Sequence, residues 1–462
     1  MSRSIFILVL LPFFYAGYAQ EQPHKLDYET FIELVMNNHP YAFQAGIAQS
    51  KGESRVRQSR GAFDPVLFGN ASQKYFDDTQ YYSRLHGGLK VPTWFGISAE
   101  MGYTLNEGQY LNPENNIPNA GLWYAGLRLE LGNGLLLDKR RAELQKAKLY
   151  QTSSEIDRMI MLNQLKRDAS IAFWQWKRAY DEATTYRYAF QNASVRLEAV
   201  KVDANMGERP YIDTVEASMI AQNRNLQRMK AETYLENAEL KLEVYLWTDG
   251  FIPLELENTI PGRSTAEEPI RFSALLDSAA RNHPLLQVNQ LKIEQQQIDL
   301  KLQREQLKPL LTLKYNAINE PVGDIPVAAY TPSNYTWGAS FSYPIFTRKE
   351  RGNVQLAELQ LLDQKLDMET NKASLKYQIN ATFNNYTLAQ EQLRTNKDLV
   401  DKNRKMYDAE KVLFDLGESS LFMINQRESA WLKAQIQLIK SENEYSMQNT
   451  ELTYQLMFFE TR

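Results

Sequence analysis

Apolar residues recur in alternating steps of three and four along residues 162–204. This spacing places them on one stripe of an α-helix, as in the seam of a coiled coil. No Pro or Gly interrupts residues 138–206, so we predict one helix there, about 100 Å long. The thirteen seam positions are Leu162, Leu165, Ala169, Ala172, Trp176, Ala179, Ala183, Tyr186, Phe190, Ala193, Leu197, Val200 and Ala204.

A second long helix is predicted over residues 350–415. Its apolar positions repeat every seven residues at Ile379, Tyr386, Leu393, Val400, Tyr407 and Phe414. Each long helix ends at a glycine, Gly207 or Gly417, the residue type that commonly follows the last helical turn. Returning helices are predicted over 211–247 and 421–459.

Two shorter helices are predicted near residues 41–61 and 285–308. Their lengths, added to those of the returning helices, roughly equal the length of a long helix. We therefore expect two short helices to stack end to end beside each long one.

Three segments, at 123–131, 310–318 and 335–346, alternate between apolar and polar residues, and an extra hairpin is predicted at about 85–106. One face carries the large apolar side chains of Trp123, Tyr315, Trp337, Phe341 and Tyr343. The other carries Arg128, Glu130 and Lys314. Such segments fit a membrane barrel with lipid outside and water in its lumen; the alternative is the edge of a soluble sandwich.

The chain contains an internal duplication. Residues 26–40 recur at an offset of 244, and both copies end in Asn-His-Pro, at Pro40 and Pro284. We predict a first repeat over 20–249, a linker over 250–269 and a second repeat over 270–462. The two triplets are interpreted as helix-starting turns rather than metal sites, because no Cys or nearby His accompanies them.

The first 19 residues predict a signal peptide, with a basic start, an apolar run and a small-residue cleavage site. No later segment of this 462-residue chain has the 18 to 20 or so uninterrupted apolar residues of a transmembrane helix. An exported chain of this kind is either soluble or enters a membrane as a β-barrel.

The composition excludes several function classes. There is no cysteine, which removes disulfides, thiol catalysis and a lipidated N-terminal cysteine. The net charge of -4 gives no general attraction for nucleic acid, so no nucleic-acid partner is expected. The sequence shows no motif of an enzyme, and we expect no catalytic residues, no cofactor and no metal.

Two strands per repeat are common to both halves, and a membrane barrel needs at least eight strands. One chain therefore cannot close a barrel, whereas three copies would supply twelve strands. Whether the extra hairpin joins the barrel or lies outside it stays open at this stage.

The signal peptide, the duplicated helix-hairpin-helix plan and the glycine-marked helical hairpins together resemble the TolC-like outer-membrane efflux protein family. The segments from Leu129 to Ala142 and from Tyr343 to Arg351 look like that family's strand-to-helix junction. The resemblance covers essentially the whole mature chain.

The resemblance implies an α+β membrane protein of the outer membrane. Its duplicated unit would form, as a homotrimer, a 12-stranded β-barrel continuous with a long periplasmic α-helical coiled-coil barrel. Such channels contact outer-membrane lipid, dock onto a periplasmic adaptor and serve an inner-membrane pump of the RND, ABC or another class, in efflux or type I secretion. The cargo stays open between drugs, metal ions and polypeptides.

The resemblance also implies roles for particular residues. The adaptor-contact tips correspond to two triplets, Gly207, Glu208 and Arg209, and Gly417, Glu418 and Ser419, although an ordinary helical turn is the alternative. The family's entrance latch joins an Asp to a Tyr and an Arg. Asp213 matches the Asp, but Phe414 and Ser419 replace the other two, which puts the latch in doubt.

A separate acidic stripe is formed by Asp401, Asp408 and Asp415, which recur every seven residues. If the stripe faces the lumen of a trimer, it forms three stacked acidic rings near the entrance that favour cations. The alternative is a solvated outer face of a coiled coil.

An outer-membrane export channel explains the signal, the duplication, the heptads and the strands together. The alternative is a periplasmic adaptor protein, which also carries a long helical hairpin. Adaptors usually have one hairpin amid globular β-domains, whereas here two whole units repeat.

Overall fold

The computed structural model describes residues 24–262, 283–321 and 331–457. The predicted signal peptide at 1–19 and the end of the predicted linker lie outside these residues. The chain forms two compact units. Unit 1 comprises Met1–Val35, Ala172–Glu267 and Asn403–Asn443; unit 2 comprises Met36–Ile171, Glu268–Lys402 and Glu444–Arg462. We describe each unit by itself.

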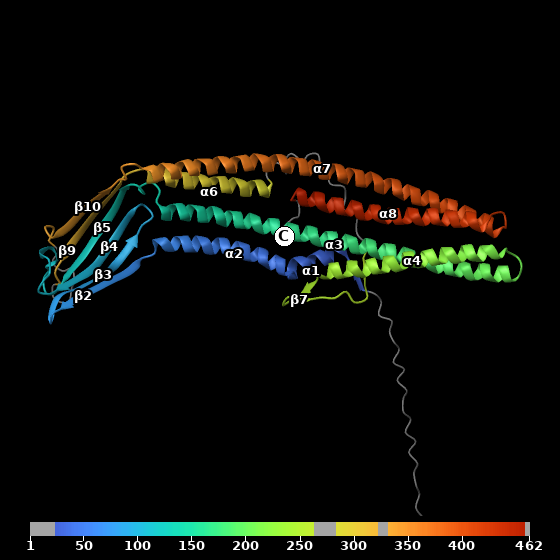
Figure 1. Cartoon of the computed structure of the whole chain (residues 1–462), viewed down its shortest axis with the longest axis horizontal. Helices are drawn as coiled ribbons and strands as arrows, with labels where there is room; N and C mark the ends of the chain where they lie inside the picture. The colour runs from blue at the N-terminus through green and yellow to red at the C-terminus, as the bar shows by residue number, and fades with distance from the viewer. Residues whose placement is uncertain (1–23, 263–282, 322–330, 458–462) are drawn as a thin grey trace, which may run out of the picture. The chain divides into compact units, whose positions relative to one another are not determined.

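Unit 2 contains a six-stranded antiparallel sheet with the order β10-β9-β5-β4-β3-β2 (Figure 1). Its strands are β2 (Val66–Phe76), β3 (Thr79–Pro92), β4 (Ile97–Glu107), β5 (Leu122–Gly132), β9 (Leu310–Asn319) and β10 (Tyr335–Ser342). Short 3-10 helices lie at Gly61–Phe63 and Pro113–Asn115. The first repeat thus contributes four strands to the sheet and the second contributes two.

The extra hairpin predicted at about 85–106 corresponds to β3 and β4 and lies inside the sheet. It separates β2 from β5, because β3 pairs with β2 and β4 pairs with β5 along their lengths. The order β5-β9 joins the first repeat to the second. The extra hairpin therefore belongs to the six-stranded sheet.

The helices of unit 2 begin at the two Asn-His-Pro triplets. α2 (Pro40–Arg60) and α6 (Pro284–Gln306) each have Pro in the first turn and a histidine at the N-cap. His39 Nδ1 accepts a hydrogen bond from the Tyr41 backbone N–H at 3.1 Å, and His283 Nδ1 accepts one from Leu285 at 3.2 Å. Both histidines are therefore helix caps.

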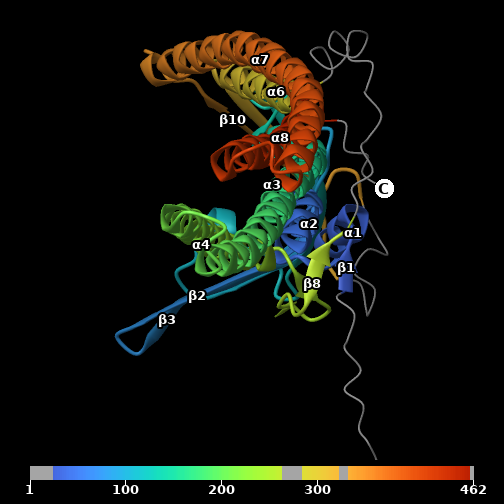
Figure 2. The ribbon, with the colours of Figure 1, turned by 90° about the vertical axis from the view of Figure 1, so that its right-hand side faces the viewer.

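α6 lies along α7 (Arg348–Asp415), as both ribbon views show (Figure 1, Figure 2). Two clusters form the helical core of unit 2. One contains Leu286, Leu375, Ile379, Tyr386, Leu452 and Leu456, and the other contains Leu137, Ala142, Ile298 and Leu302. Leu375, Ile379 and Tyr386 come from the heptad stripe of the sequence, so that stripe is a packing surface.

Unit 1 is built on two helical hairpins. α3 (Lys139–Asn205), whose residues belong to both units, turns into α4 (Tyr211–Glu243), and α7 turns into α8 (Leu421–Gln455). α1 (Tyr28–Asn38) precedes them in the chain, and β1 (His24–Leu26) pairs in parallel with β8 (Thr259–Pro261) (Figure 2). A small ladder joins β6 (Trp247–Thr248) and β7 (Ile252–Pro253).

The core of unit 1 is aromatic. Phe31 and Phe173 stack at 5.4 Å between ring centroids, and Tyr28 stacks on Trp174 at 4.7 Å. Trp176 is fully buried next to Phe173. Trp176 is one of the seam positions of the heptad pattern, so the long helix is fixed by aromatic packing as well as by small alanines.

The helix ends lie close to the ranges predicted from the sequence. α3 covers Lys139–Asn205 against 138–206, α7 covers Arg348–Asp415 against 350–415, and α4 ends at Glu243 rather than at 247. β10 ends at Ser342, so Tyr343 follows the strand instead of lying in it. No helix in the described part of the chain combines the length and the apolar character that crossing a membrane requires.

Candidate functional site

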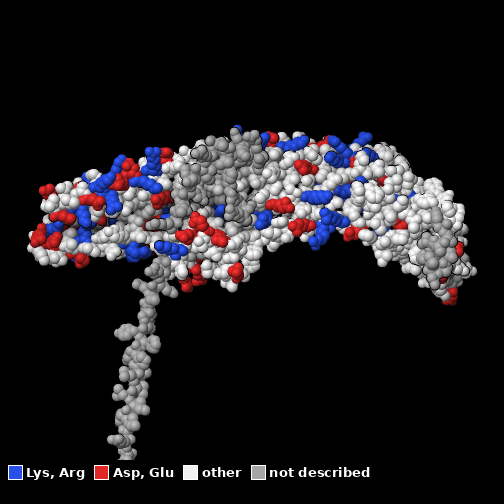
Figure 3. All heavy atoms as spheres, turned by 180° about the vertical axis from the view of Figure 1, so that it is seen from behind, with Lys and Arg blue, Asp and Glu red and all other residues white. Residues whose placement is uncertain are grey.

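The sheet of unit 2 exposes its apolar face. Trp337 and Phe341 are each 70% exposed, and Tyr315 is close to half exposed. The surface over the sheet, at the right of Figure 3, shows few charged side chains, whereas the helices carry both signs interspersed. The apolar face also contains Leu67, Leu85, Met101, Trp123, Leu127 and Leu313.

The opposite face of the sheet is polar, and several of its side chains in the inner strands are buried. Glu100 is only 7% exposed, and Ser98 and Asn316 are buried as well. In a sheet bathed in water on one side, the polar face is the exposed one. In the inner strands β4, β5 and β9 a polar side chain is buried more than its apolar neighbours, as expected for a sheet whose outer side meets an apolar medium.

Glu100 lies at the centre of an ionic cluster on the polar face. Its carboxylate oxygens lie 3.2 Å from Arg128 Nε and 3.1 Å from Lys314 Nζ, and Lys90 Nζ is 3.8 Å away. These four residues come from β3, β4, β5 and β9, so the cluster crosses four neighbouring strands. Arg128 and Lys314 were predicted from the sequence to face a lumen; Glu100 and Lys90 were missed.

Glu130, the third residue predicted for the lumen, lies on the same face. It is opposite Thr312 of β9 and two residues after Arg128 in β5. Alternation would have identified Glu100 and Lys90 too, because each is flanked by apolar-face residues such as Ala99, Met101 and Leu89.

A second polar contact on this face spans three strands. The ring of Tyr124 in β5 crosses β4, and its hydroxyl lies 3.3 Å from His86 Nε2 in β3, while His86 Nδ1 lies 2.9 Å from the Thr104 hydroxyl. Gly102 leaves the space for this crossing, since a Cβ there would come within 2.6 Å of the Tyr124 hydroxyl. Larger residues at Gly102 would displace the ring.

The strand-to-helix junction is held by Asp138. Its carboxylate accepts a hydrogen bond from the Arg141 backbone N–H at 2.8 Å and pairs with the Arg140 guanidinium at 3.0 Å. Burial alone would raise the pKa of the Asp138 carboxyl, but these bonds and charges outweigh it and lower the pKa. The carboxylate therefore stays ionised at the start of α3, where an acidic side chain is favourable.

Both helical hairpins of unit 1 turn in the same way. Gly207 and Gly417 have φ of 79° and 78°, a left-handed conformation that glycine adopts without strain. The N–H of Glu208 bonds to the Asp203 carbonyl at 3.0 Å, and that of Glu418 bonds to the Leu413 carbonyl at 2.9 Å. These are Schellman ends, so both predicted tips are structurally defined helix stops.

The residues predicted for a latch make other contacts. Phe414 lies under the Arg209 guanidinium, whose carbon is 4.9 Å from the ring centroid, and it packs on the cluster of Val200, Ala217, Leu421 and Ile424. Ser419 donates a hydrogen bond to the carboxylate of Glu410, which also lies 3.5 Å from Arg427 Nε. Asp213 lies in the first turn of α4, where its backbone N–H bonds to the Pro210 carbonyl.

Arg209 therefore links the two hairpins of unit 1. Its Nε is also 3.0 Å from the Asp203 carboxylate of its own tip. A cation over an aromatic ring contributes about 0.5–1 kcal/mol at an exposed site. From the sequence, Arg209 was predicted to lie at a tip and Phe414 to replace a latch residue. Contact between the two was not predicted.

A buried polar network joins the hairpins further along the helices. Arg196 forms a two-pronged bond to Glu428, at 2.6 and 3.2 Å, and donates to Asn425 at 2.9 Å. Asn425 donates in turn to Glu216 at 3.1 Å. Burial would lower the pKa of Arg196, yet the bonds and charge of Glu428 raise it. No motif in the sequence points to this network.

The acidic stripe is exposed in the single chain. Asp401, Asp408 and Asp415 are all exposed, and Asp408 lies 3.7 Å from Arg404 Nε on the preceding helical turn. Two alternatives from the sequence, a lumen lining and a solvated outer face, are both compatible with this exposure.

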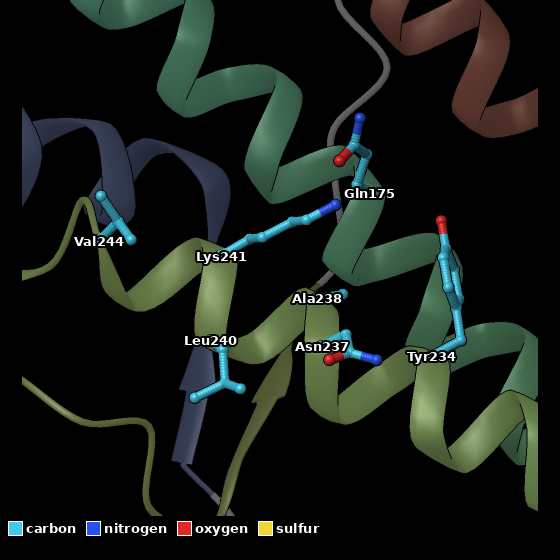
Figure 4. A pocket seen from close by; sticks show the side chains of 7 residues that line it. All are labelled: Gln175, Tyr234, Asn237, Ala238, Leu240, Lys241 and Val244. Carbon is cyan, nitrogen blue, oxygen red and sulfur yellow. The ribbon is translucent and has the colours of Figure 1, made fainter.

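A pocket of about 480 Å³ lies between α3 and α4 in unit 1 (Figure 4). The Lys241 side chain extends from α4 toward Gln175 of α3. The other lining residues are Tyr234, Asn237, Ala238, Leu240 and Val244. The lining holds no carboxylate and no nucleophile beside a base, so it offers no catalytic arrangement. Across residues 24–262, 283–321 and 331–457, no group of three or more His, Asp or Glu is arranged to hold a metal ion.

Residues 275–456 match the family model described as outer membrane efflux protein. This part of the chain is similar to the outer membrane efflux protein family. The resemblance inferred from the sequence is thereby confirmed. No curated protein matches the chain at a significant level.

Solved structures of outer membrane channels and of an outer membrane protein share the fold. The CmeC outer membrane channel of Campylobacter jejuni is 16% identical with a TM-score of 0.67, over 93% of this chain and 85% of that chain. The outer membrane protein VceC of Vibrio cholerae is 13% identical with a TM-score of 0.66, over 93% and 95%. The open-state MtrE outer membrane channel of Neisseria gonorrhoeae is 12% identical with a TM-score of 0.67, over 93% and 88%.

These matches extend over both repeats, whereas the family model covers only the second. The first repeat therefore has the same fold as the corresponding parts of these structures, although its own sequence is not matched by the model. The alternative of a periplasmic adaptor finds no support among them.

Proposed function

We propose that this protein is the outer-membrane channel of an export system, a homotrimer that conducts cargo passively from the periplasm to the exterior. The observation that carries the proposal is the exchanged exposure of the sheet, apolar outside and polar inside. Burying the exposed aromatic face in lipid removes apolar surface from water at about 25 cal/mol per Å². The family of the second repeat supports the same role.

Closure of the sheet requires other copies of the chain. β2 and β10 each have one edge without a pairing strand in the described sheet, and a free strand edge does not persist in lipid. Five antiparallel steps separate the two strands, so β2 and β10 run in opposite directions. β10 of one copy can therefore pair with β2 of the next in the antiparallel manner of a membrane barrel.

Six strands in each of three copies give an eighteen-stranded barrel. The sequence led to twelve because it counted only the strands common to both repeats. Since barrel diameter grows about linearly with strand number, eighteen strands would make the barrel about one and a half times as wide.

In this proposal the helices of unit 1 form the periplasmic end, and the tips at Gly207 and Gly417 meet an adaptor that leads to an inner-membrane pump. The tips expose Met206, Tyr211 and Leu416, apolar side chains that a partner would cover. The entrance would be held by Arg209 on Phe414, and by Arg196 with Glu428, in place of the family's latch.

The direct test is expression of the full chain, membrane fractionation and extraction in detergent. We expect a particle of three chains in the outer-membrane fraction that produces stepwise conductance in a planar bilayer. A soluble monomer, or a trimer without conductance, would contradict the proposal.

The strand count has its own test, for which the cysteine-free chain is suited because every thiol is then engineered. Ser72→Cys in β2 is combined in turn with Gly338→Cys, Ser340→Cys and Ser342→Cys in β10, all on the polar face. We expect one combination to form covalent trimers on oxidation. Ser98→Cys with Ser340→Cys, which places the first thiol on the inner strand β4, is the control that should give none. A conducting trimer without any β2 to β10 cross-link would refute eighteen strands.

A further inference from the structure

Charge is distributed between the two faces of the sheet in a strongly uneven way. Of the eight charged residues in its six strands, only Glu107, the last residue of β4, lies on the apolar face. The polar face carries five basic and two acidic side chains, a net charge of +3, although the whole chain has a net charge of -4. The seven residues are Lys74, Arg84, Lys90, Glu100, Arg128, Glu130 and Lys314.

The ionic cluster concentrates this positive charge. One carboxylate, Glu100, faces three cations, so two positive charges stay uncompensated within the cluster. The side chains of Lys90, Arg128 and Lys314 are 38%, 33% and 37% exposed, whereas that of Glu100 is 7% exposed. The carboxylate is covered and the cations are accessible from the polar side.

A structural brace alone would not require this stoichiometry. A single cation neutralises one carboxylate, and each additional cation on a neighbouring strand repels the first. Glu100 lowers that repulsion enough for three cations to sit on adjacent strands, because it lies between them. The cluster therefore holds two cations more than the neutralisation of Glu100 would require.

We infer that the polar face of the sheet is an anion-attracting section of the channel, centred on Lys90, Arg128 and Lys314, which favours chloride and small organic anions over cations. The inference rests on the proposed channel, in which this face lines the lumen. Three copies would place nine such cations around one level of the barrel, and walls of one charge raise the local concentration of counter-ions.

The acidic stripe of α7 would act in the opposite direction if it lines the entrance. Whether the intact channel prefers anions or cations therefore depends on both the polar face of the sheet and the acidic stripe. The contribution of the sheet is tested by changing charges on its polar face and measuring the shift in selectivity. The shift is measured in the wild-type chain and in a chain with Asp408→Asn and Asp415→Asn, which weaken the stripe.

The experiment measures the ratio of chloride to potassium permeability from the reversal potential in a KCl gradient across a planar bilayer. Lys90→Gln plus Lys314→Gln should lower the ratio by about twofold or more, because the face drops from +3 to +1. Glu100→Gln should raise it, because the three cations lose their counter-charge. Glu107→Gln, on the apolar face, is the matched control and should leave the ratio unchanged.

Opposite shifts for the lysine pair and for Glu100→Gln, in both backgrounds, support the inference. If the variants form conducting channels and all three keep the wild-type permeability ratio, the inference is overturned and the proposed channel is unaffected. Wild-type trimers without conductance overturn both. Trimer mass and unit conductance are recorded for every variant, so that a variant that fails to assemble is replaced by the single change Lys314→Gln, for which a smaller fall is expected.

Discussion

The helices of unit 1 and the sheet of unit 2 bury opposite kinds of residue. In unit 1 the interior is apolar, with Phe31, Phe173 and Trp176 excluded from solvent. In the sheet Glu100, Ser98 and Asn316 are buried while tryptophan and phenylalanine are exposed. The difference agrees with the surroundings of the proposed channel, water around the helices and an apolar medium around the sheet.

Charges follow the same division. In unit 1 the partly buried guanidinium of Arg196 forms one ion pair, with the carboxylate of Glu428. In the sheet the buried carboxylate meets three cations and the charges do not balance. A balanced pair stabilises the packing of helices; an unbalanced cluster is expected where the charge itself acts on passing solutes.

The largest effect is expected from the interior of unit 1. Trp176→Ala removes a fully buried indole and should lower the free energy of unfolding by about 3–5 kcal/mol, because a cavity is left beside Phe173. The measurement is the urea midpoint of the helical circular dichroism in detergent. Trp176→Phe keeps most of the ring volume and should cost clearly less. Equal midpoints for wild type and Trp176→Ala would show that this aromatic core does not fix the helices.

A charge on the apolar face of the sheet tests the other half of the comparison. Leu127→Arg, in the central strand β5, should cost about 2–4 kcal/mol if that face meets lipid, whereas at an exposed site in water the change would be within about 0.5 kcal/mol. The readout is the fraction of folded trimer recovered in lipid vesicles. Ser340→Arg places the same charge on the polar face and should be tolerated. If both variants insert equally well, the apolar face does not contact lipid.

The paired charges of unit 1 give a smaller effect. Arg196→Met or Glu428→Gln should each cost about 2 kcal/mol, because each leaves a partly buried group without its charged partner. The double variant Arg196→Met plus Glu428→Gln should cost less than the sum of the two single changes. Thermal unfolding of the three variants measures this coupling. Strictly additive costs would mean that the pair does not join the two hairpins.

Much of the helical architecture could be predicted from the sequence, because heptads, glycines and prolines are local signals. The ends of α3 and α7 lie within two residues of the ranges drawn from the spacing of apolar residues. The aromatic contacts of Phe173 with Tyr28 and Phe31 could not be predicted, since these two residues are more than a hundred residues away in sequence.

The arrangement of the sheet could be predicted less well, because it depends on more than local sequence patterns. β2 alternates weakly, with Gly69, Ala71 and Gln73 on its apolar face, so its pattern is faint. The position of the hairpin between β2 and β5 depends on pairing between distant segments, which no local pattern records. The ionic cluster has the same cause: Arg128 and Lys314 were recognised as polar-face residues, but only the register brings both to Glu100.

The smallest effect is expected at the cap of α6, where a single proton matters. His283 is buried, its Nδ1 accepts the Leu285 N–H and its Nε2 donates to the Gln455 carbonyl at 3.2 Å, so the neutral ring suits the site. Burial lowers its pKa, although the bond to Gln455 acts in the other direction. A lowered pKa means that the unfolded chain binds the proton more readily, so stability is complete above about pH 6.5 and falls as the pH drops through the lowered pKa.

We therefore expect the thermal midpoint of the wild-type protein to fall between about pH 7.5 and about pH 5.5, a range that brackets ordinary histidine titration. His283→Asn keeps an oxygen that can cap the helix but cannot titrate, and it should flatten part of this dependence. His39→Asn, at the equivalent and less buried cap of α2, is the matched control. If His283→Asn and wild type lose stability in parallel over this range, protonation of His283 does not limit the helical part of unit 2, and the polar contacts elsewhere must account for the acid sensitivity.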